Sequence, residues 1–221
     1  MRSTRETDST GKQISDNIWE GVADFDRKLV RYDRFTPQKS NGPRAIVLAG
    51  DISYWRLPDT MIPLWGGKTW TKQNETELRR KLGVSGLPEI LADPVRSLDK
   101  LREVADVTRL GREKVRGVDT RRYRGTIAVP KVNSAITVEV WIDREGRVRR
   151  IRDRYNFTKL RFDLAELERL GQEVTGSTLA NQATGDVWSV GTTEYYDFGV
   201  AVAIQLPPDS DVFDFDLGRR P

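Results

Sequence analysis

The chain has 221 residues, of which 37% are hydrophobic and 32% are charged, and its formal net charge is +4. It contains no cysteine and no histidine, which excludes disulfides, thiolate metal sites, cysteine nucleophiles and a Ser-His-Asp triad. We therefore expect no catalytic residues, no metal and no cofactor, although carboxylates, lysine or tyrosine could still serve an enzyme.

The first thirteen residues are polar and predict a disordered tail, and residues 14–221 are predicted to form a single domain. No run of 18 apolar residues is present, and the start lacks the apolar core of a signal peptide. Taken literally, the chain is cytoplasmic. If a signal segment and an anchor have been removed from it, the chain is extracytoplasmic.

The first half of the chain reads mainly as strands. Apolar and β-prone runs separated by turn residues predict strands over residues 18–35, 44–50, 51–57 and 66–73. Residues 74–83 could form a helical turn. A helix is predicted over residues 93–105, because Asp93 suits the N-cap, Pro94 suits the first helical position, and apolar residues follow at helical spacing.

The region 106–162 is predicted to be an antiparallel meander, with a hairpin turn at residues 143–146. Every second residue from Ile136 to Ile142 is apolar, which is typical of a strand with one buried face. A short helix is expected within 162–171. Two final strands are expected at 187–199 and 200–208, with one apolar face made of Phe198, Val200, Val202, Ile204 and Leu206. The fold class is α+β with mostly antiparallel sheet.

Arginine outnumbers lysine, 27 to 10. Five arginines fall opposite the apolar positions of their strands: Arg122, Arg124, Arg150, Arg152 and Arg154. The ordinary interpretation is a solvated face with acidic partners. The alternative is docking to an anionic membrane surface. No nucleic acid partner is expected, since no recognised motif accompanies these arginines.

Three tryptophans, Trp55, Trp65 and Trp70, lie close together in sequence around a proline-bearing loop. They are either ordinary core residues or the rim of an apolar ligand cavity, where a large amphipathic ring suits the boundary with water. The segment Gly66-Gly67-Lys68-Thr69 lacks the spacing of a phosphate loop and does not indicate nucleotide binding.

An ordered set of motifs extends over residues 18–213. It comprises Gly50-Asp51 with Tyr54 and Pro58, Gly67-Lys68-x-Trp70, Asp93-Pro94, Gly111-x-Glu113-x-Val115-x-Gly117-Val118-x-Thr120-x-x-Tyr123, Val140-Trp141-Ile142-Asp143-x-x-Gly146-x-Val148-x-Arg150, and Asp197-Phe198-Gly199-Val200. This set resembles the LolA-like lipoprotein-carrier superfamily, in particular the actinobacterial LppX/LprG-like lipoproteins.

The resemblance implies an unclosed half-barrel whose concave face, capped by a few helices, holds lipid acyl chains without any catalytic residue. The chain departs from the family in lacking the lipobox cysteine and in carrying an insertion-like segment at 163–186. The residues expected to line the apolar cavity are Trp55, Trp65, Tyr123, Ile127, Ile136, Val138, Val140, Phe198, Val200, Val202 and Ile204.

Two functions of different classes follow. The first is a monomeric, non-enzymatic carrier of the bacterial cell envelope that binds the acyl chains of a lipid or lipoprotein. The second is an envelope-stress sensor or interaction domain of a membrane regulator that uses the same cavity. An enzyme ranks third, and two carboxylates facing each other inside the cavity would favour it.

Overall fold

The computed structural model describes residues 2–7, 13–34, 44–81, 93–129, 134–156 and 188–214. The chain divides into two compact units, each built from distant segments. The first contains Met1–Ile18, Gly86–Arg161 and Val174–Val200, and the second contains Trp19–Ser85, Phe162–Glu173 and Ala201–Pro221. That residues 14–221 act as a single domain stays a prediction.

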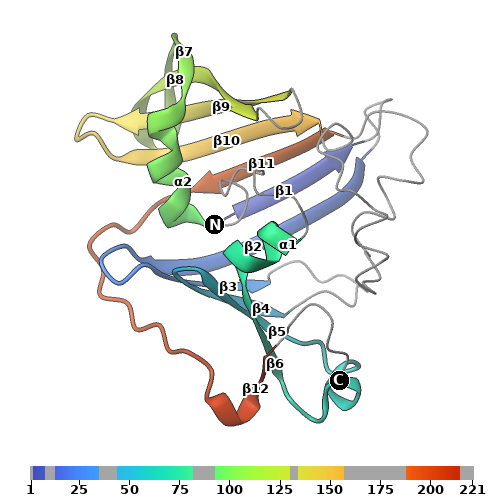
Figure 1. The fold of residues 1–221 in the computed structure, drawn as a ribbon. Helices are drawn as coiled ribbons and strands as arrows, with labels where there is room; N and C mark the ends of the chain where they lie inside the picture. The colour runs from blue at the N-terminus through green and yellow to red at the C-terminus, as the bar shows by residue number, and fades with distance from the viewer. Residues whose placement is uncertain are drawn as a thin grey trace. The chain divides into compact units, whose positions relative to one another are not determined.

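The sheet of the first unit has the strand order β1-β11-β10-β9-β8-β7, and every neighbouring pair is antiparallel (Figure 1). Its strands are β1 (Arg2–Thr7), β7 (Ala105–Val115), β8 (Val118–Val129), β9 (Ser134–Asp143), β10 (Val148–Asn156) and β11 (Trp188–Glu194). The order is linear, with β7 at its end, so this sheet is open. The predicted meander is confirmed.

The sheet of the second unit follows the order β2-β3-β4-β5-β6-β12. Its strands are β2 (Gln13–Asp24), whose first residues belong to the first unit, β3 (Leu29–Arg34), β4 (Ala45–Ala49), β5 (Ile52–Arg56), β6 (Trp70–Asn74) and β12 (Val212–Asp214). The last pair, β12 and β6, is parallel. The α-helix α1 (Glu75–Lys81) and the 3-10 turns η1 (Ile62–Trp65) and η6 (Asp209–Asp211) complete this unit. The mostly antiparallel α+β fold class is therefore confirmed.

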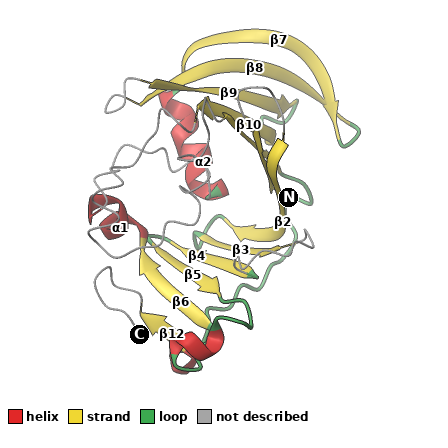
Figure 2. Cartoon of the chain, turned by 90° about the vertical axis from the view of Figure 1, so that its right-hand side faces the viewer, coloured by secondary structure: helices red, strands yellow, loops and turns green. Residues whose placement is uncertain are grey.

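Helix α2 (Pro94–Lys100) and the 3-10 turn η3 (Leu101–Glu103) lie across one face of the first unit's sheet in both views (Figures 1 and 2). The Asp93 carboxylate accepts hydrogen bonds from the backbone N–H groups of Val95 at 2.8 Å and Arg96 at 3.3 Å. With Pro94 at the first helical position, the helix begins as the sequence predicts.

Tight turns join the strands that carry the site. Between β7 and β8, Arg116 and Gly117 both have positive φ, 48° and 80°, as a two-residue hairpin requires. Between β9 and β10, the Asp143 carboxylate accepts hydrogen bonds from the backbone N–H groups of Glu145 at 3.0 Å and Arg147 at 2.9 Å. The hairpin predicted at residues 143–146 is confirmed.

Two sequence predictions differ from the structure. Residues 2–7 form β1, paired with β11, where a disordered tail was expected. This polar strand is held by main-chain hydrogen bonds, which require no apolar pattern in the sequence, so the sequence contains no sign of it. The strand predicted at 200–208 is wrong, because these residues carry no strand. Positive φ values at Asp197 (52°) and Gly199 (80°) end the extended backbone there. The helix predicted at 162–171 lies outside the described residues.

Gly125 in β8 is required because the backbone at the start of β7 passes close to it. A Cβ atom at this position would lie 2.6 Å from the backbone oxygen of Ala105 and would overlap the side chain of Val104. We expect Gly125→Ala to lower the free energy of unfolding by about 1–3 kcal/mol, because a backbone atom must move. Chemical denaturation followed by circular dichroism would measure this change. Ala128→Ser, an exposed substitution on the same strand, is the control and should change stability by less than about 0.5 kcal/mol.

Candidate functional site: an apolar core face backed by a charged face

Strand register places one set of apolar residues on a single face of the first unit's sheet, called here the core face. Tyr123 lies opposite Val140, and Ile127 lies opposite Ile136, across β8 and β9. Val140 in turn lies opposite Ile151 of β10. Because directly opposed residues of paired strands share a face, these side chains form one continuous surface.

The buried residues of the core face form an apolar cluster, which consists of Ile127, Ile136, Val138, Val140, Ile151, Tyr155 and Tyr195. Leu98 of α2, Leu101 of η3 and Val104 pack against this cluster and provide part of its cover. The Tyr195 hydroxyl donates a hydrogen bond to the backbone oxygen of Pro94 at 3.2 Å, which ties the start of α2 to the end of β11. The sequence did not identify these helix contacts as part of the site.

One carboxylate is buried on the core face. Asp153 alternates with Ile151 and Tyr155 along β10 and is only 2% exposed. It lies opposite Gly191 of β11, where a Cβ atom would come within 2.5 Å of the Asp153 Oδ1 atom. Gly191 therefore leaves the space that this carboxylate occupies. In the sequence, Asp153 stands at every second position with Ile151 and Tyr155, and this alternation could have placed it on the buried face. It was not among the site residues expected from the sequence.

The structure brings five of the predicted cavity residues together on the core face. Ile127, Ile136, Val138 and Val140 are buried in the apolar cluster, and Tyr123 is half-buried beside them. Their role in binding a ligand stays a prediction.

Four other predicted cavity residues belong to the second unit. Ile204 is buried in a separate cluster with Leu29 and Val47. Trp55 is half-buried, and its Nε1 donates a hydrogen bond to the Ser53 Oγ atom at 2.8 Å. The remaining two side chains are also half-buried: that of Val202 and that of Trp65, which packs edge-on against Phe213 at 5.1 Å between ring centroids.

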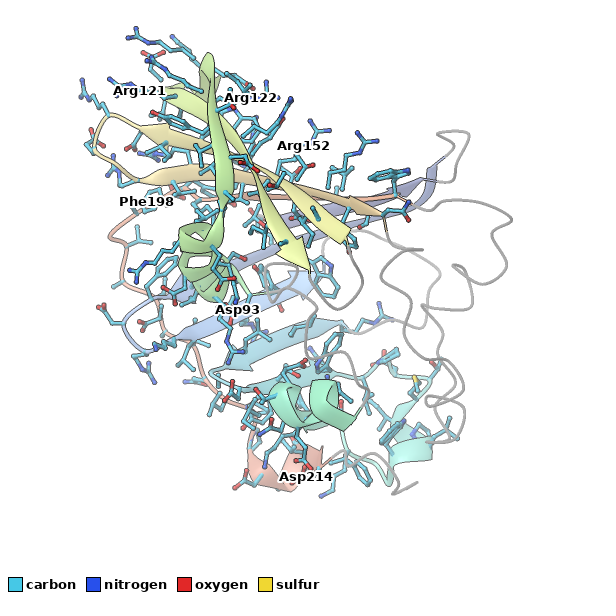
Figure 3. The ribbon with its side chains drawn as sticks, turned by 45° about the horizontal axis from the view of Figure 1, so that its top comes forward. Asp93, Arg121, Arg122, Arg152, Phe198 and Asp214 are labelled. Carbon is cyan, nitrogen blue, oxygen red and sulfur yellow. The ribbon has the colours of Figure 1, made fainter. Side chains whose placement is uncertain are left out.

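Phe198 and Val200 are exposed rather than packed on the core face, with 37% and 59% of their surface accessible. The Phe198 ring contacts the guanidinium groups of Arg147 and Arg149, whose Cζ atoms lie 5.3 Å and 4.7 Å from the ring centroid. Figure 3 labels Phe198 in the segment that follows β11. The one-sided apolar face expected here is wrong, because the segment is not a strand.

The opposite face of the same sheet, called here the charged face, is organised around buried carboxylates. Glu139 of β9 accepts hydrogen bonds from the Arg122 Nη2 atom at 2.8 Å and the Arg124 Nη2 atom at 2.7 Å. The Asp143 side chain, which is fully buried, accepts from the Nε atoms of Arg147 at 3.0 Å and Arg149 at 2.7 Å.

Trp141 lies in the middle of the charged face. The guanidinium groups of Arg122 and Arg150 lie 5.0 Å and 5.2 Å from its ring centroid, and its Nε1 donates a hydrogen bond to the Glu113 carboxylate at 2.9 Å. The Arg150 Nη2 atom also donates to the Glu194 carboxylate at 2.7 Å. A continuous ionic and aromatic network thus joins strands β7 to β11.

The five arginines proposed for membrane contact differ in their surroundings. Arg122, Arg124 and Arg150 are paired with carboxylates, as the solvated-face interpretation expects. Arg154 is exposed and lies over the Trp188 ring at 4.4 Å. Arg152 is exposed, and within the described part of the chain it has no ion pair (Figure 3). Contact of these residues with a membrane stays a prediction.

The network lowers the pKa values of its carboxylates. Burial alone raises the pKa of Glu139, but hydrogen bonds from Arg124 and Arg122 outweigh this effect, so the pKa lies below its ordinary value. The pKa of Glu194 is lowered in the same way against burial, by Arg150 and Arg116. For Asp143, burial is again outweighed, here by the backbone N–H of Arg147 and by the Arg149 and Arg147 side chains.

Neither face presents a recognisable metal centre. Within the ranges that the structure describes, no three acidic side chains come together in a way that could hold a metal ion. Nor does any helix of these ranges have the length and apolar character needed to span a membrane.

Comparison with known proteins gives relatives among actinobacterial proteins. No family model matches the chain. An uncharacterised 31.2 kDa protein of Streptomyces griseus is 25% identical over 75% of this chain and 54% of its own length. A Streptomyces coelicolor protein named "Putative lipoprotein" is 28% identical over 75% of this chain and 49% of its own length. The chain thus spans about half the length of these relatives, and it is similar to an actinobacterial lipoprotein, as the sequence predicted.

Solved structures to which the chain is similar include two mycobacterial proteins. The lipoprotein LppX of Mycobacterium tuberculosis is 15% identical, with a TM-score of 0.45 over 91% of this chain and 87% of that chain. LprF of Mycobacterium bovis is 12% identical, with a TM-score of 0.39 over 93% of this chain and 88% of that chain.

The lowered carboxylate pKa values predict how stability depends on pH. A carboxylate whose pKa is lower in the folded state stabilises the fold fully above its unfolded pKa of about 4, and this contribution is lost as the pH falls through the folded value. The free energy of unfolding should therefore fall as the pH drops below about 5. Glu139→Gln should cost about 1–3 kcal/mol at pH 7 and should make the decline in acid shallower.

Urea denaturation between pH 7 and pH 3 would measure both effects. Glu103→Gln is a suitable control, because Glu103 forms an exposed ion pair with Lys100 and no hydrogen bond within the network. An identical acid decline in Glu139→Gln and the unaltered protein would mean that Glu139 does not contribute to the pH dependence.

Proposed function

We propose that the protein is a non-enzymatic carrier of the bacterial cell envelope that holds the acyl chains of a lipid or lipoprotein on its core face. The observation that carries this proposal is the apolar cluster on three neighbouring strands, β8, β9 and β10. Its cover from the described helices is limited to the seven-residue α2 and the three-residue η3. The cluster residues are at most 9% exposed, so an apolar ligand would bind this face by replacing part of its present cover.

The energetics of acyl-chain binding suit this face. Burying about ten methylene groups contributes roughly 8 kcal/mol before the cost of ordering the chain and the protein. Ile127, Ile136 and Val138 offer branched apolar side chains and no polar atoms, so they would contact a chain without leaving an unpaired group. The half-buried Tyr123 would lie at the boundary between this surface and water.

The envelope location rests on similarity to the Streptomyces coelicolor protein named as a lipoprotein. A carrier of this kind needs no catalytic group. Its cargo would be taken up and released by exchange with an acceptor membrane. This protein, expressed in bacteria, should therefore retain an amphiphile through purification. Native mass spectrometry would detect it as a mass above that of the polypeptide.

Tyr123→Ala provides a test of the core face as the binding surface. We expect this variant to bind a fluorescent fatty acid at least several-fold more weakly, because part of the apolar contact surface is removed, while its unfolding midpoint changes little. Fluorescence titration and thermal melts would measure the two quantities. Leu64→Ala removes an exposed apolar side chain of the second unit and should leave the affinity unchanged. Equal affinity in both variants and the unaltered protein would argue against binding at Tyr123.

Contact with an anionic membrane would depend on the two arginines of the charged face that lack a carboxylate partner among the described residues, Arg152 and Arg154. Near an anionic surface each contributes about 1 kcal/mol, so the double variant Arg152→Gln/Arg154→Gln should bind anionic vesicles about thirtyfold more weakly at low salt. Vesicle sedimentation would measure this. The charge-matched control is Arg27→Gln/Arg102→Gln, at exposed positions of other elements. Equal binding to neutral and anionic vesicles would exclude electrostatic docking.

A further inference from the structure

Three arginines lie at the β7–β8 edge of the core face. Arg112 of β7 lies directly opposite Arg121 of β8, and Arg109 lies opposite Tyr123. A bulge between Arg109 and Gly111 restores the parity, so that Arg109, Arg112 and Arg121 all share the face of Tyr123. We call these three residues the rim arginines.

The rim arginines adjoin the apolar cluster. Arg121 lies opposite Ile142 of β9, and Ile142 packs against the cluster. The next residue, Arg122, has its side chain on the charged face, since successive side chains of a strand point to opposite faces. Figure 3 labels both residues at the same end of the sheet.

The charge balance of the two faces differs. On the charged face, Arg122, Arg124 and Arg150 each have a carboxylate within 2.8 Å. The rim arginines are exposed, and none of them forms an ion pair within the part of the chain that the structure describes. Like charges directly opposite each other in a sheet destabilise it, and this applies to the pair Arg112–Arg121. The acidic residue that shares their face by register, Asp119, lies opposite Lys114 and forms its ion pair with that lysine at 4.0 Å.

We infer that the rim arginines bind the phosphate group of an anionic amphiphile whose acyl chain occupies the core face. Guanidinium groups bind phosphate oxygens bidentately, and two opposed arginines present such donors from both sides. Tyr123 lies between Arg109 of β7 and Val140 of the apolar cluster, so headgroup and chain sites are contiguous. This inference rests on the proposed function and adds the class of ligand, a phosphate-bearing lipid.

The test compares two 12-carbon ligands that differ only in the phosphate, lauroyl lysophosphatidic acid and monolauroylglycerol, below their micelle-forming concentrations. Calorimetric titration should show that the full chain binds the phosphate ligand about tenfold more tightly, and that this preference falls as salt rises from 50 to 500 mM. Arg121→Gln and Arg112→Gln should each reduce the preference several-fold and leave binding of monolauroylglycerol unchanged.

The control is Arg144→Gln, which removes the same charge from a side chain that is 91% exposed at the β9–β10 turn. It should keep the full preference. Equal affinity for both ligands, unchanged in Arg121→Gln, would overturn the inference and leave the carrier proposal standing. Absence of binding by either ligand would overturn both.

A further arm separates a lipid headgroup from a free anion. Glycerol 3-phosphate should bind at least a hundredfold more weakly than the lysolipid, because it lacks the chain. Equal affinity would show that the rim arginines bind soluble phosphate, which contradicts the lipid assignment.

Self-association of Arg112→Gln with no change in ligand preference would show instead that these charges protect the edge of the sheet, since β7 is an edge strand.

Discussion

The alternation of side chains along β8, β9 and β10 is the constraint on which the first unit depends. Strand β9 carries apolar residues on the core face and Glu139 on the charged face, so a slip of one residue in β9 would turn Glu139 toward the apolar cluster and Val138 toward Arg122. The cost of burying an unpaired carboxylate makes this slip unfavourable. The ionic network and the apolar cluster therefore specify the same register.

The charged face also fixes the positions of neighbouring strands. Glu139 and Glu194 are largely buried although they lie on the outer surface, because arginines from neighbouring strands cover them. Such networks hold adjacent strands in fixed positions through several hydrogen bonds at once. The buried apolar side chains of the core face are then held at constant spacing, since strand positions are fixed from the other side.

Much of the first unit could be predicted from its sequence. The cap at Asp93, the turn at residues 143–146 and the alternation from Ile136 to Ile142 are local patterns with a direct structural reading. The segment after β11 could not be predicted in the same way. Phe198, Val200 and Val202 alternate as in a strand, yet whether extended backbone becomes a strand depends on a partner for its hydrogen bonds. Positive φ at Asp197 and Gly199 directs the chain away from such pairing.

Register also separates arginines that the sequence could not distinguish. Arg121 and Arg122 are adjacent in the sequence, so in a strand their side chains point to opposite faces. This alternation does not tell which of the two forms an ion pair with a carboxylate. Only the three-dimensional pairing of β8 with β9 places Glu139 beside Arg122, and only the bulge in β7 places Arg112 rather than Gly111 opposite Arg121. An arginine already neutralised by a carboxylate has little left to offer an anionic ligand, because binding would first require breaking that pair. The arginines available to a ligand are therefore those at the edge of the core face, where an anion would relieve repulsion instead of competing with an existing bond.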